Sequence, residues 1–373
     1  MPILGVESDA MNPPTAPPDV LRIAQVAPLW ARVPPIDYGG TELRVSWLTE
    51  ELVARGHHVT LFASGDSQTR AKLQPITSRN LMDIMAAGSA YHYAHYANAS
   101  LAEAIRRRDA YDLIHCHSEL EHTPFGLLAG IPFIYSLRTA LSIDDIWLLQ
   151  RYPEITFVAM SRSQIREVPD ERRRTIPVIY NGCRFEDDPP LQEPGAYLVF
   201  LGRMGVHKNP KGAIDIARAM GMPIVLAGVP QDRDERAYFE REIRPLIDGT
   251  DVQYIGPVDH AQKTALLRHA AALLFPIQWE EPFGIVMIEA MACGVPVLAC
   301  NRGSVAEVID PGITGFYADS VEELATFAPS ALRLDRRHIY EHAKQRFSHI
   351  RMVDEYTQLY QTMISVHKNY TSR

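Results

Sequence analysis

Short apolar runs alternate with longer amphipathic stretches along nearly the whole chain. We predict strands at residues 21–27, 58–63, 112–117, 132–136, 156–161 and 175–180, and then at residues 197–201, 224–228, 252–255, 272–275 and 297–299. Amphipathic helices are expected between them, and Thr41 is expected to cap the first one. Because short apolar strands alternating with helices are typical of parallel sheets covered on both faces, the pattern predicts an α/β fold.

A break in this pattern divides the chain into two parts. The turn pair Asn181-Gly182 is followed by a polar, proline-rich segment at residues 186–195, which is expected to be a linker. We therefore predict two facing Rossmann-like domains, residues 20–183 and 184–349, with a C-terminal helix at about 350–373 that crosses back to the first domain. Residues 1–19, rich in proline, are expected to form a mobile tail. Ligands of such sheets bind beyond the carboxyl ends of the strands, so the site should lie in the cleft between the domains.

Composition narrows the class of protein. The chain has 373 residues, of which 46% are apolar and 22% charged, with a net charge of −8; this suits two folded domains and argues against a nucleic-acid partner. Two arginine clusters occur at residues 106–108 and 172–174. They belong either to a solvated surface or to a site of peripheral contact with anionic lipid. Four cysteines without a close pair, and no apolar run that would span a bilayer, predict a cytoplasmic protein with reduced thiols. The sequence does not define the oligomeric state.

Residues 280–296 carry the clearest chemical signal. An apolar run that ends at Pro276 predicts a buried strand, and a glycine-containing turn then opens a helix. Glu281 lies at the mouth of this helix and Glu289 about two turns inside it. A helix N-terminus attracts anions, and a carboxylate accepts hydrogen bonds from hydroxyls. This layout suits a sugar linked to a nucleoside through a diphosphate, which has an anion in its middle and hydroxyls on both sides.

Four blocks together resemble the family 4 glycosyltransferases, retaining enzymes of the GT-B fold that include glycogen-synthase-like and phosphatidylinositol-mannosyltransferase-like members. The blocks are residues 39–42 (GGTE), 112–117 (DLIHCH), 202–210 (GRMGVHKNP) and 281–315, which contains the two glutamates and the GSVAEVI segment. They occur in the family's order over roughly residues 20–365. Three positions depart from the family pattern: Asn209 replaces the usual glycine, Arg184 an acidic residue and Arg138 a histidine.

The resemblance implies a role for each block. Arg203 and Lys208 would bind the diphosphate, Glu289 the ribose, and Glu281 the transferred sugar. Six further residues are expected to contact the donor, in the segments 39–40 and 283–286: Gly39, Gly40, Phe283, Gly284, Ile285 and Val286. The candidate catalytic residues are His117, Glu281, Arg203 and Lys208.

In the first domain His117 resembles a histidine near the reacting centre. We expect His115 on the opposite face of the same strand, in a structural role, because side chains alternate along a strand. Arg138 is expected to face the cleft, where it would contact an acceptor or the donor, or else form a salt bridge within the domain. Tyr91 and Tyr93 either line an acceptor pocket or belong to an ordinary aromatic helix face.

These observations predict a retaining hexosyltransferase that uses a nucleotide-diphosphate sugar, with UDP favoured and GDP as an alternative, and no cofactor. The acceptor would be a small molecule, a lipid-linked compound or a glycan. No metal is expected, because Arg203 and Lys208 can neutralise the leaving diphosphate, and Asp232-Arg233-Asp234 is expected to be a solvated loop instead of a metal ligand set. A nucleotide-sugar epimerase of the same fold and a non-catalytic nucleotide-sugar-binding subunit are the alternatives.

Overall fold

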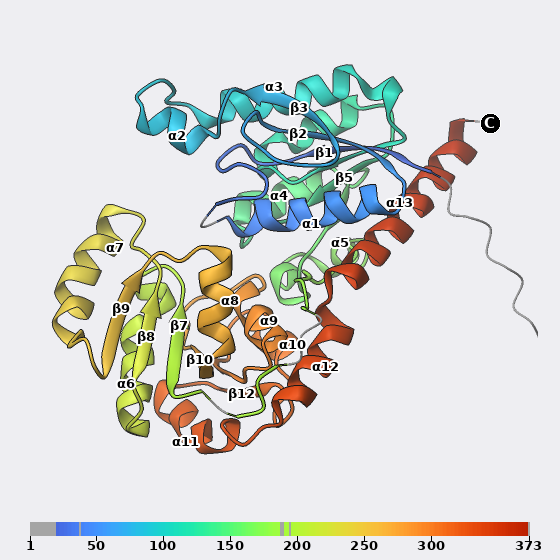
Figure 1. Ribbon diagram of the computed structural model, residues 1–373. Helices are drawn as coiled ribbons and strands as arrows, with labels where there is room; N and C mark the ends of the chain where they lie inside the picture. Colours follow the sequence, from blue (N-terminus) through green and yellow to red (C-terminus); the bar gives the residue numbers. More distant parts are fainter. Residues whose placement is uncertain (1–19, 37–38, 187–189, 194, 372–373) are drawn as a thin grey trace, which may run out of the picture.

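The computed structural model describes residues 20–36, 39–186, 190–193 and 195–371, so the tail at residues 1–19 and part of the 186–195 linker lie outside the described residues. It contains two six-stranded parallel sheets with helices on their faces (Figure 1). The predicted α/β class with two Rossmann-like parts is confirmed. The boundaries 20–183 and 184–349 stay predictions.

The first sheet has the strand order β3-β2-β1-β4-β5-β6. Its strands are β1 (Arg22–Val26), β2 (His58–Ser64), β3 (Lys72–Thr77), β4 (Leu113–Cys116), β5 (Phe133–Ser136) and β6 (Thr156–Val158). The strand predicted at 175–180 was wrong: only a single bridge, from Ala159 to Val178, forms there. The edge strand β3 was missed, because it is largely half-exposed and contains Pro75, which is tolerated only at an edge.

The second sheet has the order β12-β11-β10-β7-β8-β9. Its strands are β7 (Tyr197–Leu201), β8 (Ile224–Ala227), β9 (Val252–Gly256), β10 (Ala270–Phe275), β11 (Val297–Cys300) and β12 (Gly315–Ala318). The four-residue edge strand β12 was not predicted. In each sheet the order reverses beside the first strand, between β1 and β4 and between β7 and β10. Ligands of doubly wound sheets bind at such points.

The helices lie between the strands and after them. They are α1 (Gly40–Ala54), α2 (Leu81–Ala86), α3 (Tyr93–Arg106), α4 (Ile143–Arg151), α5 (Asp170–Arg173), α6 (Pro210–Met220), α7 (Arg233–Tyr238), α8 (His260–Arg268), α9 (Ile285–Ala292), α10 (Val305–Val308), α11 (Val321–Ala331), α12 (Arg336–Phe347) and α13 (His349–Thr371), with shorter 3-10 turns between some of them.

Two expectations about helix starts were wrong. Helix α1 already begins at Gly40, after Gly39 and without a side-chain cap, so Thr41 lies inside its first turn. Asp232 does not sit in a free loop; its carboxylate accepts a hydrogen bond from the Glu235 N–H and caps α7. An acidic N-cap satisfies backbone donors that the helix cannot pair, which explains this aspartate without a metal.

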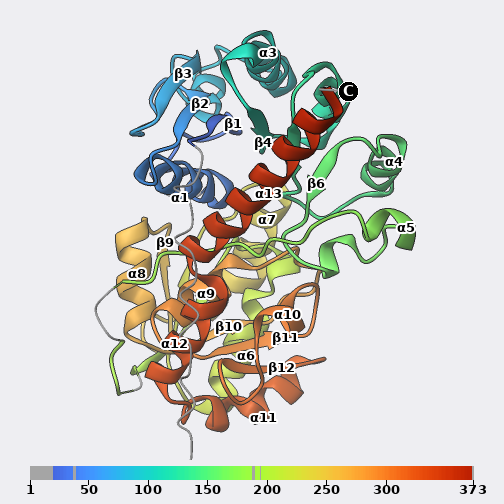
Figure 2. The same cartoon turned by 90° about the vertical axis from the view of Figure 1, so that its right-hand side faces the viewer.

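Helix α13 runs from the second domain back along the first, as Figure 2 shows. Its buried side chains Met352, Val353, Tyr356 and Tyr360 join the apolar core beside β1. The C-terminal residues therefore complete the packing of the N-terminal sheet.

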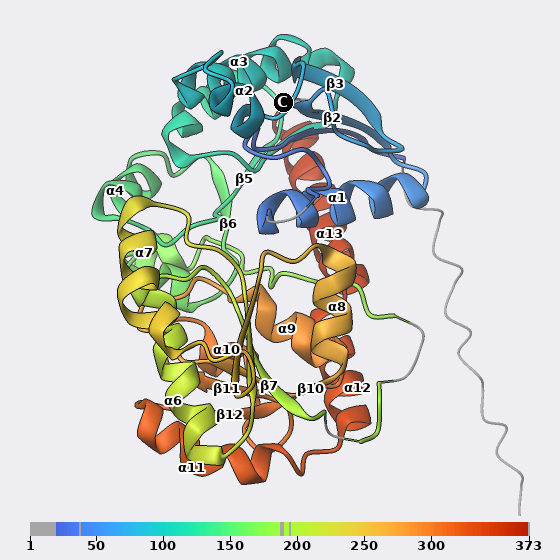
Figure 3. The same cartoon turned by 60° about the vertical axis from the view of Figure 1, so that its left-hand side comes forward.

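The two domains meet where α1 lies above α8 and α9 (Figure 3). A Cβ added at Gly40 would lie 3.6 Å from Cδ1 of Ile285, and the Trp47 and His260 rings are 6.2 Å apart. The helix N-termini of α1 and α9 thus approach each other across the interface.

On the other side of the interface Glu307 receives three hydrogen bonds from the first domain. The donors are the backbone N–H groups of Arg162 and Ser163, at 2.8 and 2.6 Å, and the Tyr180 hydroxyl at 3.0 Å. The Ser161 hydroxyl also donates to the Pro282 carbonyl at 2.7 Å. These contacts hold the loop before α9 against the first domain.

Candidate functional site

The loop between β10 and α9 forms one wall of the site. Its last residue, Gly284, has φ of 71°, and a Cβ there would lie 2.7 Å from Cε of Met287 and 3.1 Å from Cζ of Phe275. A side chain at this position would be both strained and crowded, so glycine is required for the close turn into the helix. Gly303 packs closely against this loop, because a Cβ added at Gly303 would overlap the Glu281 backbone.

Lys208 and Glu281 are joined at the centre of this loop. The Lys208 ammonium donates a hydrogen bond to Oε2 of Glu281, which also accepts one from Nε1 of Trp279 at 3.1 Å. Both charged side chains are largely buried, and the ammonium lies 4.9 Å from the centre of the Trp279 ring. The structure thus brings together two residues that the sequence had assigned to the diphosphate and to the sugar.

Arg203 lies in a second charged group, at the carboxyl end of β7. Its guanidinium is 3.3 Å from Oε1 of the buried Glu235 and donates to Nε2 of His207 at 2.9 Å. Burial, together with the positive charges of Arg203 and Lys208, lowers the pKa of His207. The neutral ring can therefore accept the arginine's hydrogen bond.

Glu289 points from inside α9 toward α8 and not toward Glu281. Its Oε1 accepts a hydrogen bond from the Lys263 ammonium at 2.6 Å, and only about a tenth of its side chain is exposed. The two glutamates thus belong to separate ion pairs, Glu281 with Lys208 and Glu289 with Lys263. Each carboxylate therefore has a cation of its own in a partly buried position.

His115, within β4, and His117, directly after it, lie on the same side of the sheet, so the expectation of opposite faces was wrong. Positions two apart share a face of a strand, and the His115 and His117 ring centres are 3.8 Å apart. His115 contacts the hydroxyls of Tyr360 and Ser136, at 2.6 and 2.7 Å. His115 therefore links the sheet to α13, while His117 lies one step nearer the carboxyl end of the strand.

His117 is buried between a neutral and a charged partner. Its Nε2 is 2.6 Å from Oε1 of Gln25, and its Nδ1 accepts a hydrogen bond from Arg138. Burial holds the pKa of His117 well below its usual range, and His115, Arg138 and Arg44 reinforce this effect. His117 is therefore neutral at physiological pH, and the N–H at Nε2 can donate to Gln25.

The Arg138 side chain turns inward at the end of β5. Its hydrogen bonds go to His117 and, at 3.5 Å, to the Asn181 side chain, instead of to a carboxylate of the described residues. The salt bridge considered from the sequence is therefore not formed there. Burial lowers the Arg138 pKa, and Tyr356, Tyr360 and Glu42 oppose that shift.

The other predicted donor-side residues differ in how far they are exposed. Phe283 is fully buried, with Tyr180 and Phe347 rings about 6.1 Å away, so only its backbone can reach a ligand. Ile285 and Val286, in the first turn of α9, are half-buried. At Gly39 a Cβ would lie 2.7 Å from Cβ of Pro35.

The two predicted acceptor tyrosines are separated. Tyr91 precedes α3 and is 74% exposed. Tyr93 opens α3, is buried, stacks on Trp30 with ring centres 4.1 Å apart, and accepts a hydrogen bond from the Leu29 N–H. Tyr93 is thus part of a packed aromatic pair, and Tyr91 lies on the surface.

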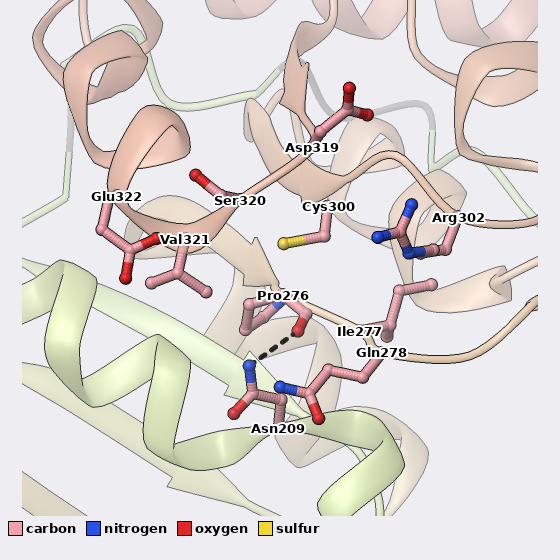
Figure 4. A pocket seen from close by; sticks show the side chains of 10 residues that line it. All are labelled: Asn209, Pro276, Ile277, Gln278, Cys300, Arg302, Asp319, Ser320, Val321 and Glu322. Atoms are coloured by element: carbon pink, nitrogen blue, oxygen red, sulfur yellow. Dashed lines mark hydrogen bonds between the residues drawn. The ribbon is translucent and has the colours of Figure 1, made fainter.

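A pocket of about 400 Å³ includes Asn209 and Gln278, which are the chain neighbours of Lys208 and Trp279 (Figure 4). It opens at the carboxyl ends of β10, β11 and β12, near the first residues of α6 and α11, and is lined by Asn209, Pro276, Ile277, Gln278, Cys300, Arg302, Asp319, Ser320, Val321 and Glu322. Neither Lys208 nor Glu281 lines it. This pocket offers one cation, Arg302, whereas Lys208 and Arg203 together offer two, so the group of Lys208, Glu281, Arg203 and Glu235 is the better candidate for a diphosphate site.

Sequence reasoning missed three residues that are bonded to the predicted site residues. Trp279 lies two residues before Glu281. This spacing could have predicted the contact, because an indole N–H can donate a hydrogen bond to a nearby carboxylate. Lys263 and Glu235 carried no signal, because each reaches its partner from a different helix.

Among the described residues no three His, Cys, Asp or Glu side chains are grouped so as to hold a metal ion. The described helices also include none that is long and apolar enough to cross a membrane.

Two family models match the chain in succession. Residues 38–186 match the model described as Glycosyltransferase Family 4, and residues 184–346 match the model described as Glycosyl transferases group 1. Among curated relatives, a glycogen synthase of Mycobacterium tuberculosis is 26% identical over 345 residues, covering 79% of this chain and 81% of that protein. A D-inositol 3-phosphate glycosyltransferase of Mycolicibacterium smegmatis is 24% identical and 85% of each chain is covered.

Solved structures share the fold. The glycosyltransferase AviGT4 of avilamycin A biosynthesis aligns with a TM-score of 0.70 and 23% identity, covering 92% of this chain and 98% of that one. Anabaena HepE in complex with UDP-glucose aligns with a TM-score of 0.69 and 19% identity, covering 92% and 100%.

Proposed function

This chain belongs to the family 4 glycosyltransferases of the GT-B fold, and we propose that it moves a hexosyl group from a nucleotide-diphosphate sugar to an acceptor hydroxyl with retention of configuration. The observation that carries the proposal is that the Lys208–Glu281 pair and Arg203 lie near one another at the carboxyl edge of the second sheet: the His207 ring, which accepts a hydrogen bond from Arg203, is 5.7 Å from the ring of Trp279, which donates to Glu281. This group supplies cations for a diphosphate and a carboxylate for sugar hydroxyls.

The proposed reaction breaks the bond between the sugar's anomeric carbon and the diphosphate oxygen. Negative charge then builds on the departing diphosphate, and cations placed beforehand stabilise it. Lys208 and Arg203 would take this role, with N–H groups at the start of α9 as further donors. The reaction then proceeds without a metal: the acceptor oxygen bonds to the anomeric carbon on the face that the diphosphate leaves, and the hydroxyl proton passes to the departing phosphate oxygen.

The carboxylates and the histidine would hold the sugar and the ribose. Glu289 would accept hydrogen bonds from the ribose hydroxyls and Glu281 from hydroxyls of the hexose, since each carboxylate can accept several. Binding would require Lys208 to exchange Glu281 for the diphosphate. Neutral His117 would contact the hexose or the acceptor from the first domain.

UDP is the favoured nucleotide, with GDP as the alternative. HepE, which shares the fold, binds UDP-glucose. Relatives named for glycogen and inositol phosphate suggest a glycan or a small polyol as acceptor. The four cysteines are all free, which supports a cytoplasmic location.

Nucleotide release tests the proposal. The full chain would be incubated with UDP-, GDP- and dTDP-hexoses, with EDTA present or absent, and free nucleotide would be measured. We expect release from at least one donor, unchanged by EDTA, and product with the anomeric configuration of the donor. Conversion of the donor sugar without nucleotide release would favour an epimerase, and nucleotide-sugar binding without any turnover would favour a non-catalytic subunit.

A further inference from the structure

Trp30 and Glu119 meet at the reversal point of the first sheet. Trp30 lies four residues after β1 and Glu119 three residues after β4, the two strands between which the order changes direction. In doubly wound sheets this edge is where ligands bind. Glu119 also follows His117 by only two residues, so this pair lies next to the part of the first domain assigned to the reacting centre.

The Trp30 ring is held flat by its neighbours. One face stacks on Tyr93, with ring centres 4.1 Å apart and an interplanar angle of 5°. Its Nε1 donates a hydrogen bond to Oε1 of Glu119 at 3.1 Å. The ring nevertheless remains 39% exposed. An aromatic ring fixed on one face and along one edge offers its other face to an apolar surface of a ligand.

Glu119 has hydrogen-bonding capacity beyond its protein partners. Its carboxylate interacts with Trp30 and with the Tyr93 hydroxyl, whereas an ionised carboxylate offers about four lone-pair sites. The Glu119 side chain is 37% exposed. Oε2 is buried, so a ligand hydroxyl would donate to Oε1, which can accept a second hydrogen bond while it keeps the tryptophan oriented.

The charges around this pair disfavour an anionic ligand. Burial raises the pKa of Glu42, at the start of α1; the positive charge of Arg44 opposes this shift, and the negative charge of Glu119 adds to it. The Glu119 and Glu121 carboxylates lie 3.9 and 3.7 Å from Nε2 of His122, so two acidic groups are close together here. Burial raises the pKa of Glu119, and the charge of Glu121 adds to this shift. A third negative group, such as a phosphate, would be repelled by these carboxylates at close range. A neutral molecule with several hydroxyls meets no such penalty.

We infer that Trp30 and Glu119 form the acceptor subsite, and that the acceptor is a neutral carbohydrate whose apolar ring face stacks on Trp30 while its hydroxyls donate to Glu119. This inference rests on the proposed hexosyl transfer and adds to it the class of acceptor. It excludes phosphorylated sugars and inositol phosphates as the preferred acceptors. The tyrosine that matters here is Tyr93, which supports the tryptophan from behind instead of touching the acceptor.

The test separates donor use from acceptor use. With the nucleotide sugar that is turned over, transfer would be measured to 4-nitrophenyl α- and β-hexosides, to maltose and cellobiose, and to glucose 6-phosphate and inositol 3-phosphate. We expect at least one neutral compound to stimulate nucleotide release and the phosphorylated compounds to be poorer by tenfold or more. Stimulation mainly by the phosphorylated compounds, or by none of the neutral ones, overturns the inference.

Variants locate the subsite. Trp30→Ala should raise the acceptor KM at least tenfold, with the donor KM changed less than twofold, and Trp30→Phe, which keeps a stacking ring, should be intermediate. Glu119→Gln should raise the acceptor KM three- to tenfold. Trp147→Ala, which removes another exposed tryptophan on α4, serves as the control and should leave both KM values unchanged. An unchanged acceptor KM in folded Trp30→Ala and Trp30→Phe refutes the assignment, whereas absence of nucleotide release from every donor counts against the proposed function instead.

Discussion

The Lys208 ammonium and the Glu281 carboxylate form a hydrogen-bonded ion pair between the end of the loop that precedes α6 and the loop that precedes α9. The pair neutralises a cation in the place where a diphosphate would need one. In the proposed reaction a donor would compete with Glu281 for Lys208, and Glu281 would then be released toward the sugar. The ion pair would in this way couple diphosphate binding to sugar binding.

Replacement of Lys208 should mainly lower the turnover rate. Lys208→Met keeps the length of the side chain but removes the charge, so the leaving diphosphate loses a stabilising cation. We expect the turnover rate to fall by about 10²–10³-fold, the size typical for one lost group of this kind. The measurement is nucleotide release at saturating donor, with Lys211→Met on the exposed face of α6 as the control. Turnover of Lys208→Met within threefold of the wild type would contradict the assigned role.

The two glutamates of the α9 block should differ in their effects. Glu289→Ala should weaken nucleotide binding about tenfold, which corresponds to about 1.4 kcal/mol, because a ribose partner is lost. Glu281→Ala should mainly slow transfer and leave nucleotide affinity within threefold. Titration calorimetry with UDP and initial transfer rates measure the two effects, with Glu240→Ala, an exposed glutamate, as the control. If both variants behave like the wild type, the donor site lies elsewhere.

Glu235 should act through Arg203. Glu235→Gln keeps an oxygen for the Gln231 N–H, to which Glu235 is bonded at 2.7 Å, but removes the charge beside the guanidinium. We expect the donor KM to rise about tenfold while the rate at saturation changes less than threefold, since Arg203 is less firmly held before binding. A fall in the saturated rate with an unchanged KM would show that Glu235 does not position the arginine for binding.

Acidification should destabilise the fold through His117. The native protein keeps this buried histidine neutral, whereas in the unfolded chain it takes up a proton near its ordinary pKa of 6.5. The unfolded state therefore binds more protons below that value, and stability falls as the pH is lowered through it. Between pH 7.5 and 5.5 the loss from one such histidine is about 1.4 kcal/mol.

Urea unfolding of the wild type and of His117→Asn at these two pH values checks this expectation. The variant should lose about 1.4 kcal/mol less than the wild type on acidification, whatever its stability at pH 7.5. His58→Asn, at the exposed start of β2, should show the full wild-type loss. An identical loss in His117→Asn and the wild type would mean that His117 is not kept neutral by its surroundings.

Glu307 should control how the domains close. Glu307→Ala removes the acceptor of three hydrogen bonds from the first domain, and a bond to a charged group contributes roughly 1.5–3 kcal/mol. We expect a larger radius of gyration in small-angle X-ray scattering and transfer slowed by about tenfold or more. Glu341→Ala, exposed on α12, is the control. A radius of gyration and a rate equal to those of the wild type would show that these bonds do not limit closure.

Much of this molecule could be predicted from local patterns. Apolar runs placed ten of the twelve strands, because side chains alternate along a strand and a buried run is apolar throughout. The glycine turn before α9 and the block that holds Glu281 and Glu289 could also be read locally. Strands β3 and β12 were not predicted, since β3 contains Pro75 and has one buried residue, and β12 has only four residues of which two are half-buried.

The sequence by itself determined the α/β class, the two series of strands, and the residue types that a nucleotide sugar needs. Only the tertiary structure decided which of these residues meet. Lys208 reaches Glu281 across 73 positions, and His115 reaches Tyr360 across 245. Helix and strand periods are properties of neighbouring residues, so a sequence displays them. An ion pair or a buried hydrogen bond depends on strand order and on the packing of distant elements, which no local pattern records.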